Sequence, residues 1–168
     1  MATQQTSRDP EFERGLPSNV YAERMVLGAI LLNDSTFVAV ASALMADDFS
    51  VEKHRKIFRR MVELNDREER IDRVTLANEL MKYGELEAVD GLSYLISLDE
   101  GLPELHNLES YVQIVKEKAV LRELIYSSQE IMQRCYMGEE APAGIISAAQ
   151  TSLLKLSESQ TKADLVSA

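Results

Sequence analysis

Residues 107–137 read NLESYVQIVKEKAVLRELIYSSQEIMQRCYM, and this stretch contains neither glycine nor proline. The absence of both helix breakers predicts one continuous helix. At about 1.5 Å of rise per residue, about 30 helical residues span roughly 45 Å. That length is large for a chain of 168 residues. We therefore expect the helix to project beyond the core to which it belongs.

A second helix is predicted to fold back on the first. Gly138 ends the long helix, and a turn through Pro142 leads into GIISAAQTSLLKLSES, which again has apolar residues at helical spacing. The apolar positions form heptad-like seams, made of Ile114, Leu121, Ile125, Ser128, Met132 and Cys135 on the first helix and of Ile146, Ala149, Leu153 and Leu156 on the second. Two such helices indicate an antiparallel hairpin, here residues 104–157.

Residues 17–103 are predicted to form a compact head of shorter helices. The candidate N-terminal caps of these helices are Ser18 or Asn19, Asp34, Ser50, Asp72 and Asp90. No segment alternates apolar and polar residues over a strand's length, so we expect no strands. The fold class is therefore all-α, with a compact helical head followed by a protruding antiparallel helical hairpin. Residues 1–16 are polar and unpatterned, which is typical of a disordered tail.

The charge of the chain restricts its function. The net charge is −10 and the isoelectric point is about 4.7. Nucleic-acid binders grip phosphates with clustered lysine and arginine, so we expect little direct nucleic-acid binding. The N-terminus lacks the basic start and apolar run of a signal peptide, and no apolar run is long enough to span a membrane. The single Cys135 has no partner for an internal disulfide. These features favour a reduced, cytoplasmic protein without contact to a membrane.

No catalytic motif stands out. The chain has no G-x-x-x-x-G-K-[ST] sequence, so it cannot hold a nucleotide in a P-loop. With one cysteine and two histidines, a zinc site is also implausible. His54 lies near acidic residues and suggests a base or a metal ligand, but local packing or capping at the start of its helix is the favoured interpretation. We therefore expect no catalytic residue, metal or cofactor in this chain.

Arginines and tyrosines of the long helix allow two interpretations each. Arg122 and Arg134 are candidate phosphate contacts, but glutamates near them on the same helix favour pairing within the helix. Tyr126 is expected to pack, with partner anchoring as the alternative, because a protruding arm exposes what a core would cover.

The order of four stretches carries a family resemblance. They read LPSNVYAERMVLGAILL, DDFSVEKHRKIF, IDRVTLANELMKYGELEAVDGLSYLISL and LPELHNLESYVQIVKEKAVLREL. In this order and spacing they resemble the N-terminal domain of the DnaB-type replicative DNA helicases. The resemblance covers residues 17–157. It departs from the family at Ser50, where an aromatic residue is common.

The resemblance implies an assembly and interaction domain without catalysis. In the family this domain forms dimers, partly through the hairpin, and these join as a trimer of dimers in an N-terminal collar on the hexamer. It binds primase and helps to receive the helicase loader. ATP and magnesium belong to the ATPase domain of such a parent, which follows a linker, and residues 158–168 resemble the start of that linker.

For packing and self-association of the hairpin we expect Leu121, Ile125, Tyr126, Met132, Ile146 and Leu153, without assigning either role to either face. Two alternatives remain open. The chain is either a free-standing helical adaptor or decoy that binds the replicative helicase, or a small helical enzyme that uses carboxylates such as Asp72 or Glu79.

Overall fold

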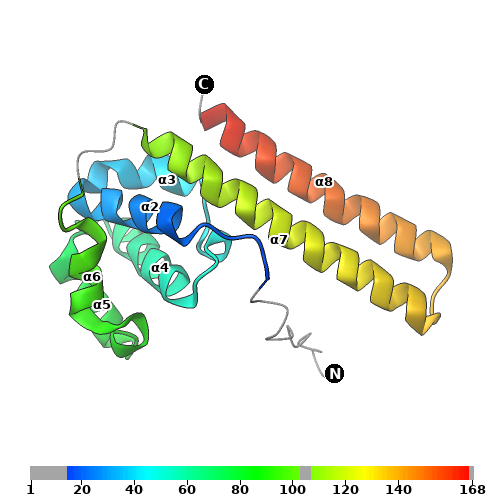
Figure 1. The fold of residues 1–168 in the computed structure, drawn as a ribbon, viewed down its shortest axis with the longest axis horizontal. Helices are drawn as coiled ribbons and strands as arrows, with labels where there is room; N and C mark the ends of the chain where they lie inside the picture. The colour runs from blue at the N-terminus through cyan, green and yellow to red at the C-terminus, as the bar shows by residue number, and fades with distance from the viewer. Residues whose placement is uncertain (1–14, 103–106, 167–168) are drawn as a thin grey trace.

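The computed structural model describes residues 15–102 and 107–166, with side chains up to residue 159. Figure 1 shows a group of short helices from which one helical pair projects. The head contains α2 (Val20–Leu32), α3 (Phe37–Ala43), α4 (Glu52–Asp66), α5 (Arg73–Lys82) and α6 (Gly91–Asp99), with short 3-10 turns η1 (Asp34–Thr36), η2 (Ala46–Asp48) and η3 (Glu87–Val89). The described residues contain no strand, so the all-α prediction is confirmed. Most of the predicted tail, 1–16, lies outside these residues.

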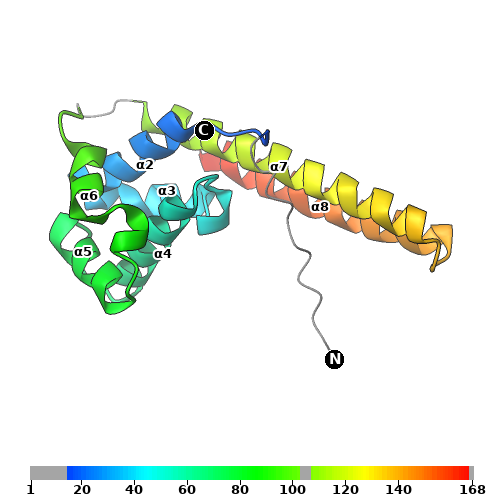
Figure 2. The same ribbon diagram turned by 60° about the horizontal axis from the view of Figure 1, so that its bottom comes forward.

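The projecting pair consists of α7 (Leu108–Met137) and α8 (Pro142–Val166). Figure 2 shows them lying antiparallel, with the first turns of α7 extending past the end of α8. Gly138 ends α7 with a φ of 64°, as predicted. The second helix was predicted to end at 157, but α8 continues to Val166 because no glycine or proline interrupts SESQTKADLV. That residues 158–168 begin an interdomain linker stays a prediction. Within the described residues, no helix is long and apolar enough to cross a bilayer.

The caps of the head helices show where local reasoning succeeds. The Asn19 side chain accepts from the Ala22 amide, and Asp72 accepts from Val74 and Thr75, as predicted. The prediction for Ser50 was wrong, because Val51 stands at the N-cap of α4 and makes no side-chain capping bond. Asp90 does occupy the N-cap position of α6, but its side chain accepts from Lys53 and makes no capping bond.

The Asp34 prediction was wrong by one residue. The cap there is Asn33, whose side chain accepts from the Ser35 amide at 3.2 Å. Asp34 is instead the first residue of η1, so the cap lies immediately before it.

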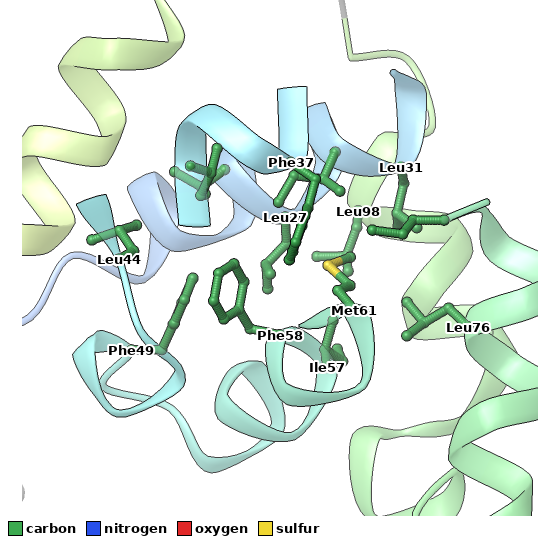
Figure 3. Close-up of a cluster of buried hydrophobic side chains, with 14 of the residues drawn as sticks. Leu27, Leu31, Phe37, Leu44, Phe49, Ile57, Phe58, Met61, Leu76 and Leu98 are labelled. Atoms are coloured by element: carbon green, nitrogen blue, oxygen red, sulfur yellow. The ribbon is translucent and has the colours of Figure 1, made fainter. Parts of the chain in front are cut away.

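The core of the head lies between α2, α3 and α4 (Figure 3). Phe58 is fully buried between two other rings, with its centroid 5.0 Å from that of Phe49 and 5.7 Å from that of Phe37. Burying an aromatic side chain of this kind stabilises a fold by about 1.5–3 kcal/mol. The first third of α7 joins this core through Val112 and Val115.

Gly28 lets α2 and α6 approach closely. A β-carbon placed there would lie 2.2 Å from the carbonyl oxygen of Leu98, which is a backbone atom and cannot turn aside. Only a residue without a β-carbon therefore fits at this crossing of α2 and α6.

A buried polar group braces α2, α4 and α6 together. His54 Nδ1 lies 2.5 Å from Glu23 Oε2, and His54 Nε2 lies 2.7 Å from the Tyr94 hydroxyl. Glu23 also accepts from the amide and the hydroxyl of Ser50, at 2.7 and 2.5 Å. Glu23 and His54 are 1% and 0% exposed. Ser50 therefore satisfies a buried carboxylate, which is why its hydroxyl is not available to cap α4.

The hydrogen bonds of this buried group set the charge state of the Glu23 carboxyl group. Burial alone would raise the pKa of this carboxyl group, but the hydrogen bonds from His54 and Ser50 outweigh burial, and the pKa lies below the ordinary value of 4.5. A carboxylate with a lowered pKa stabilises the fold above its unfolded pKa. This contribution is lost as the pH falls through the folded value.

We predict that Gly28→Ala lowers the free energy of unfolding by about 2 kcal/mol, because overpacking against backbone outweighs the better helix propensity of alanine. Urea unfolding followed by circular dichroism measures the change. Gly144→Ala is the matched control, because its β-carbon would meet only the flexible end of Glu140 at 3.3 Å. Equal stability of the two variants would contradict the close contact at Gly28.

We predict that Glu23→Gln costs about 2 kcal/mol at pH 7, because the amide satisfies the donors of His54 and Ser50 less well than a carboxylate does. The difference from the parent should shrink as the pH falls below 4.5, where the parent loses the contribution of its carboxylate. Thermal unfolding between pH 7 and pH 3 tests this. Glu52→Gln, on the exposed start of α4, is the control, and a Glu23→Gln deficit that does not change with pH would refute the argument.

Candidate protein interface on the helical hairpin

One face of α7 is apolar and uncovered. Leu121 and Met132 are 43% and 57% exposed, and Ile125 between them is partly buried. A shallow depression of about 320 Å³ lies along this face and is lined by Pro17, Leu121, Leu124, Ile125, Ser128, Gln129 and Met132. None of these seven side chains carries a charge. Pro17 precedes α2, and we call the other six residues, which all lie on α7, the α7 stripe.

The apolar surface continues toward the tip of the hairpin. Tyr136 is 85% exposed, and it lines a second open depression together with Met132 and Met137. An exposed tyrosine next to methionines has the composition of a protein-binding surface, where aromatic residues and methionine are enriched.

On α8, two neighbouring isoleucines have different environments. Ile145 is 8% exposed and borders a hollow with Ile131 of α7, so it packs within the hairpin. Ile146 is 57% exposed at the rim of the same hollow, and Leu153 is 49% exposed. Of the six residues predicted for packing or self-association, Leu121, Met132, Ile146 and Leu153 thus lie on the surface, while Ile125 and Tyr126 are partly buried. Their role in self-association stays a prediction.

Two buried cations of α7 fix the hairpin on the head. Lys116 Nζ lies 3.0 Å from the Asp48 carboxylate. Arg122 donates to the carbonyl oxygens of Pro17 and Asp48, at 2.8 and 2.5 Å. Burial lowers the pKa of the Arg122 guanidinium below its usual value, with opposing contributions from Glu23, Tyr126 and Asp48.

The expected pairing of Arg122 with glutamates of its own helix was wrong. Arg122 points into the head and donates to two carbonyls there, whereas ion pairs with exposed glutamates of its own helix would contribute little to stability. Arg134 does pair within α7, at 4.0 Å from Glu130, but its nearer partner is Glu140 in the turn to α8, at 2.5 Å.

A polar cleft of about 760 Å³ lies where the head meets both hairpin helices. Its lining combines basic and acidic side chains, among them Arg55, Arg59, Asp47, Glu52 and Glu123, with apolar residues such as Leu16 and Leu156. Within this lining, Arg59 lies 3.8 Å from the Asp47 carboxylate. The charges of the two signs balance, so the cleft does not attract phosphate in particular.

The catalytic candidates are engaged in structural contacts. The buried His54 side chain bonds Glu23 of α2 and Tyr94 of α6, so it neither caps its own helix nor reaches solvent. Asp72 caps α5, and Glu79 binds Arg67 and Lys82 at 2.9 Å each. The side chains described up to residue 159 include no group of three or more His, Cys, Asp or Glu residues that could hold a metal.

Comparisons with known proteins agree with this architecture. Residues 15–117 match the family model of the DnaB-like helicase N-terminal domain. The chain is 37% identical over 142 residues to the replicative DNA helicase DnaC of Bacillus subtilis, and 36% identical over 146 residues to the replicative DNA helicase DnaB of Geobacillus stearothermophilus. These matches cover 84% and 87% of this chain but 31% and 32% of the relatives. The chain thus spans about a third of their length.

Solved structures give the same result. The N-terminal domain of DnaB helicase from Mycobacterium tuberculosis superposes with a TM-score of 0.77 and 32% identity, covering 84% of this chain and 99% of that one. A DnaB-like replicative helicase whose interactions with primase were described has a TM-score of 0.69 and 25% identity, over 84% of this chain and 31% of that one. The head, the projecting hairpin and the matched residues lead to one conclusion: the chain belongs to the DnaB-like helicase N-terminal domain family.

Proposed function

We propose that this chain is the non-catalytic assembly and interaction domain of a replicative DNA helicase in the cytoplasm. It forms the N-terminal collar by self-association and docks primase and the helicase loader. ATP and magnesium act in the ATPase domain of such a helicase, and this chain needs no cofactor. The single observation that carries the proposal is the uncharged α7 stripe on an arm that extends past the head.

The α7 stripe is best suited to bind a second copy of the same chain. In a two-fold symmetric contact each residue faces the same patch on its partner, so charged residues of one sign would oppose each other. The chain has a net charge of −10, yet the α7 stripe has no charged side chain. Such a surface is self-compatible in a molecule that otherwise repels its own copies.

Primase is the second partner that we propose. One structural relative was described together with its interactions with primase, and it shares the fold of this chain over 84% of the length. The exposed Tyr136 and Met137 near the hairpin tip provide an apolar surface outside the α7 stripe. Docking of the helicase loader is proposed from the family relationship alone.

We predict that Ile125→Asp weakens self-association on the order of a hundredfold, because a carboxylate would be buried at the centre of the contact. Light scattering behind size exclusion, across a concentration series, measures the oligomer. Circular dichroism should remain largely unchanged. Val74→Asp is the control, since Val74 is 71% exposed on α5 of the head and should not affect the oligomer. An Ile125→Asp chain that stays fully oligomeric would refute self-association through the stripe.

We also predict that the chain binds the primase of its own cell, as measured by isothermal titration calorimetry. Tyr136→Ala should weaken binding by about tenfold, because tyrosine anchors of interfaces often contribute more than 1 kcal/mol. Tyr83→Ala, at a 54% exposed tyrosine of the head, is the matched control. Binding that is lost equally in both variants, or in neither, would place the primase site elsewhere.

A further inference from the structure

The segment that leads into α2, residues 15–19, lies alongside α7. Figures 1 and 2 both show this dark blue lead-in segment beside the middle of the long helix. Leu16 and Pro17 face different hollows. Leu16 lines the polar cleft with Tyr126 and Leu156, whereas Pro17 lines the apolar depression with Leu121 and Ile125. The lead-in segment thus separates the cleft from the α7 stripe.

One side chain fastens this segment. The Arg122 guanidinium donates to the Pro17 carbonyl at 2.8 Å, and its other terminal nitrogen donates to the Asp48 carbonyl at 2.5 Å. Arg122 is 7% exposed, so these two bonds replace water that it would otherwise bind. It follows Leu121 directly and precedes Ile125 by three residues on α7. The residue that holds Pro17 therefore belongs to the helix that carries the stripe.

We propose that the lead-in segment is part of the self-association surface and that Arg122 is its positioning residue. In this proposal Arg122 does not contact the second copy of the chain. It holds Pro17 so that the proline ring extends the apolar depression of the α7 stripe, and the second copy packs against both. This inference rests on the proposed self-association and adds to it a second, non-helical element.

Three physical reasons favour a role for the lead-in segment in self-association, in addition to its packing against α7 of its own chain. Proline has no amide hydrogen to leave unsatisfied and its φ angle is fixed, so little conformational entropy is lost when it is held at an interface. Its ring adds uncharged surface beside uncharged side chains, as contact between two copies of an acidic chain requires. The apolar packing of Val112, Val115 and Ala119 already attaches α7 to the head without the segment.

The test compares dimer dissociation constants by sedimentation equilibrium. Arg122→Gln removes the fork that reaches both carbonyls, and Pro17→Ser removes the apolar ring but keeps the carbonyl that Arg122 binds. We expect each change to raise the dissociation constant, about tenfold for Arg122→Gln and on the order of fivefold for Pro17→Ser. Arg73→Gln is the matched control, because Arg73 binds Asp99 within the head, and it should leave the constant unchanged.

The outcomes separate this inference from the proposal on which it rests. If Ile125→Asp weakens the dimer while Arg122→Gln and Pro17→Ser do not, the segment lies outside the contact and the inference is overturned, although self-association stands. If Ile125→Asp has no effect, both are overturned. Should Arg122→Gln unfold the chain, Pro17→Ser decides alone, since it leaves the buried cation and its two acceptors in place.

Discussion

The architecture depends on α7 being a single uninterrupted helix that belongs both to the head and to the projecting hairpin. Its first half is part of the head, where Val112 and Val115 join the core and Lys116 and Arg122 bind head groups. Its second half extends beyond the head, with α8 covering one side. A rigid helix with 30 residues cannot bend back to bury its remaining face on the head. The exposed stripe is therefore a direct consequence of helix length.

The head can anchor such an arm because its own helices are tied by more than apolar packing. The Glu23–His54–Tyr94 group connects three helices through ring and carboxylate atoms, each of which has a partner in the described residues. A buried carboxylate is costly unless its acceptors are satisfied, and here Ser50 and His54 supply the donors. This arrangement fixes α4 against α2, and thereby fixes η2, whose Asp48 receives both cations of α7.

The sequence was informative where the deciding interactions are local. Asn19 and Asp72 cap within three residues, Gly138 ends α7 by its own conformation, and α7 continues because nothing breaks it. Prediction from the sequence failed where a side chain bonds a residue that is distant in the chain. Ser50, Asp90 and Arg122 all have plausible local roles, but their partners lie 27, 37 and up to 105 residues away. Helical spacing gives no information about such partners, so the lead-in segment could not be foreseen.

Only the structure shows which apolar residues of α7 pack against α8 and which face solvent. Heptad-like spacing identified Leu121, Ile125 and Met132 but could not tell whether they meet α8 or solvent. In the fold, Ile131 and the predicted seam residue Cys135 border the hollow against α8. The seam residues Leu121, Ile125, Ser128 and Met132 line the open depression instead. A two-helix hairpin needs only one apolar face on each helix. A second face does not help the monomer to fold and lowers its solubility, so its presence is best explained by contact with another molecule.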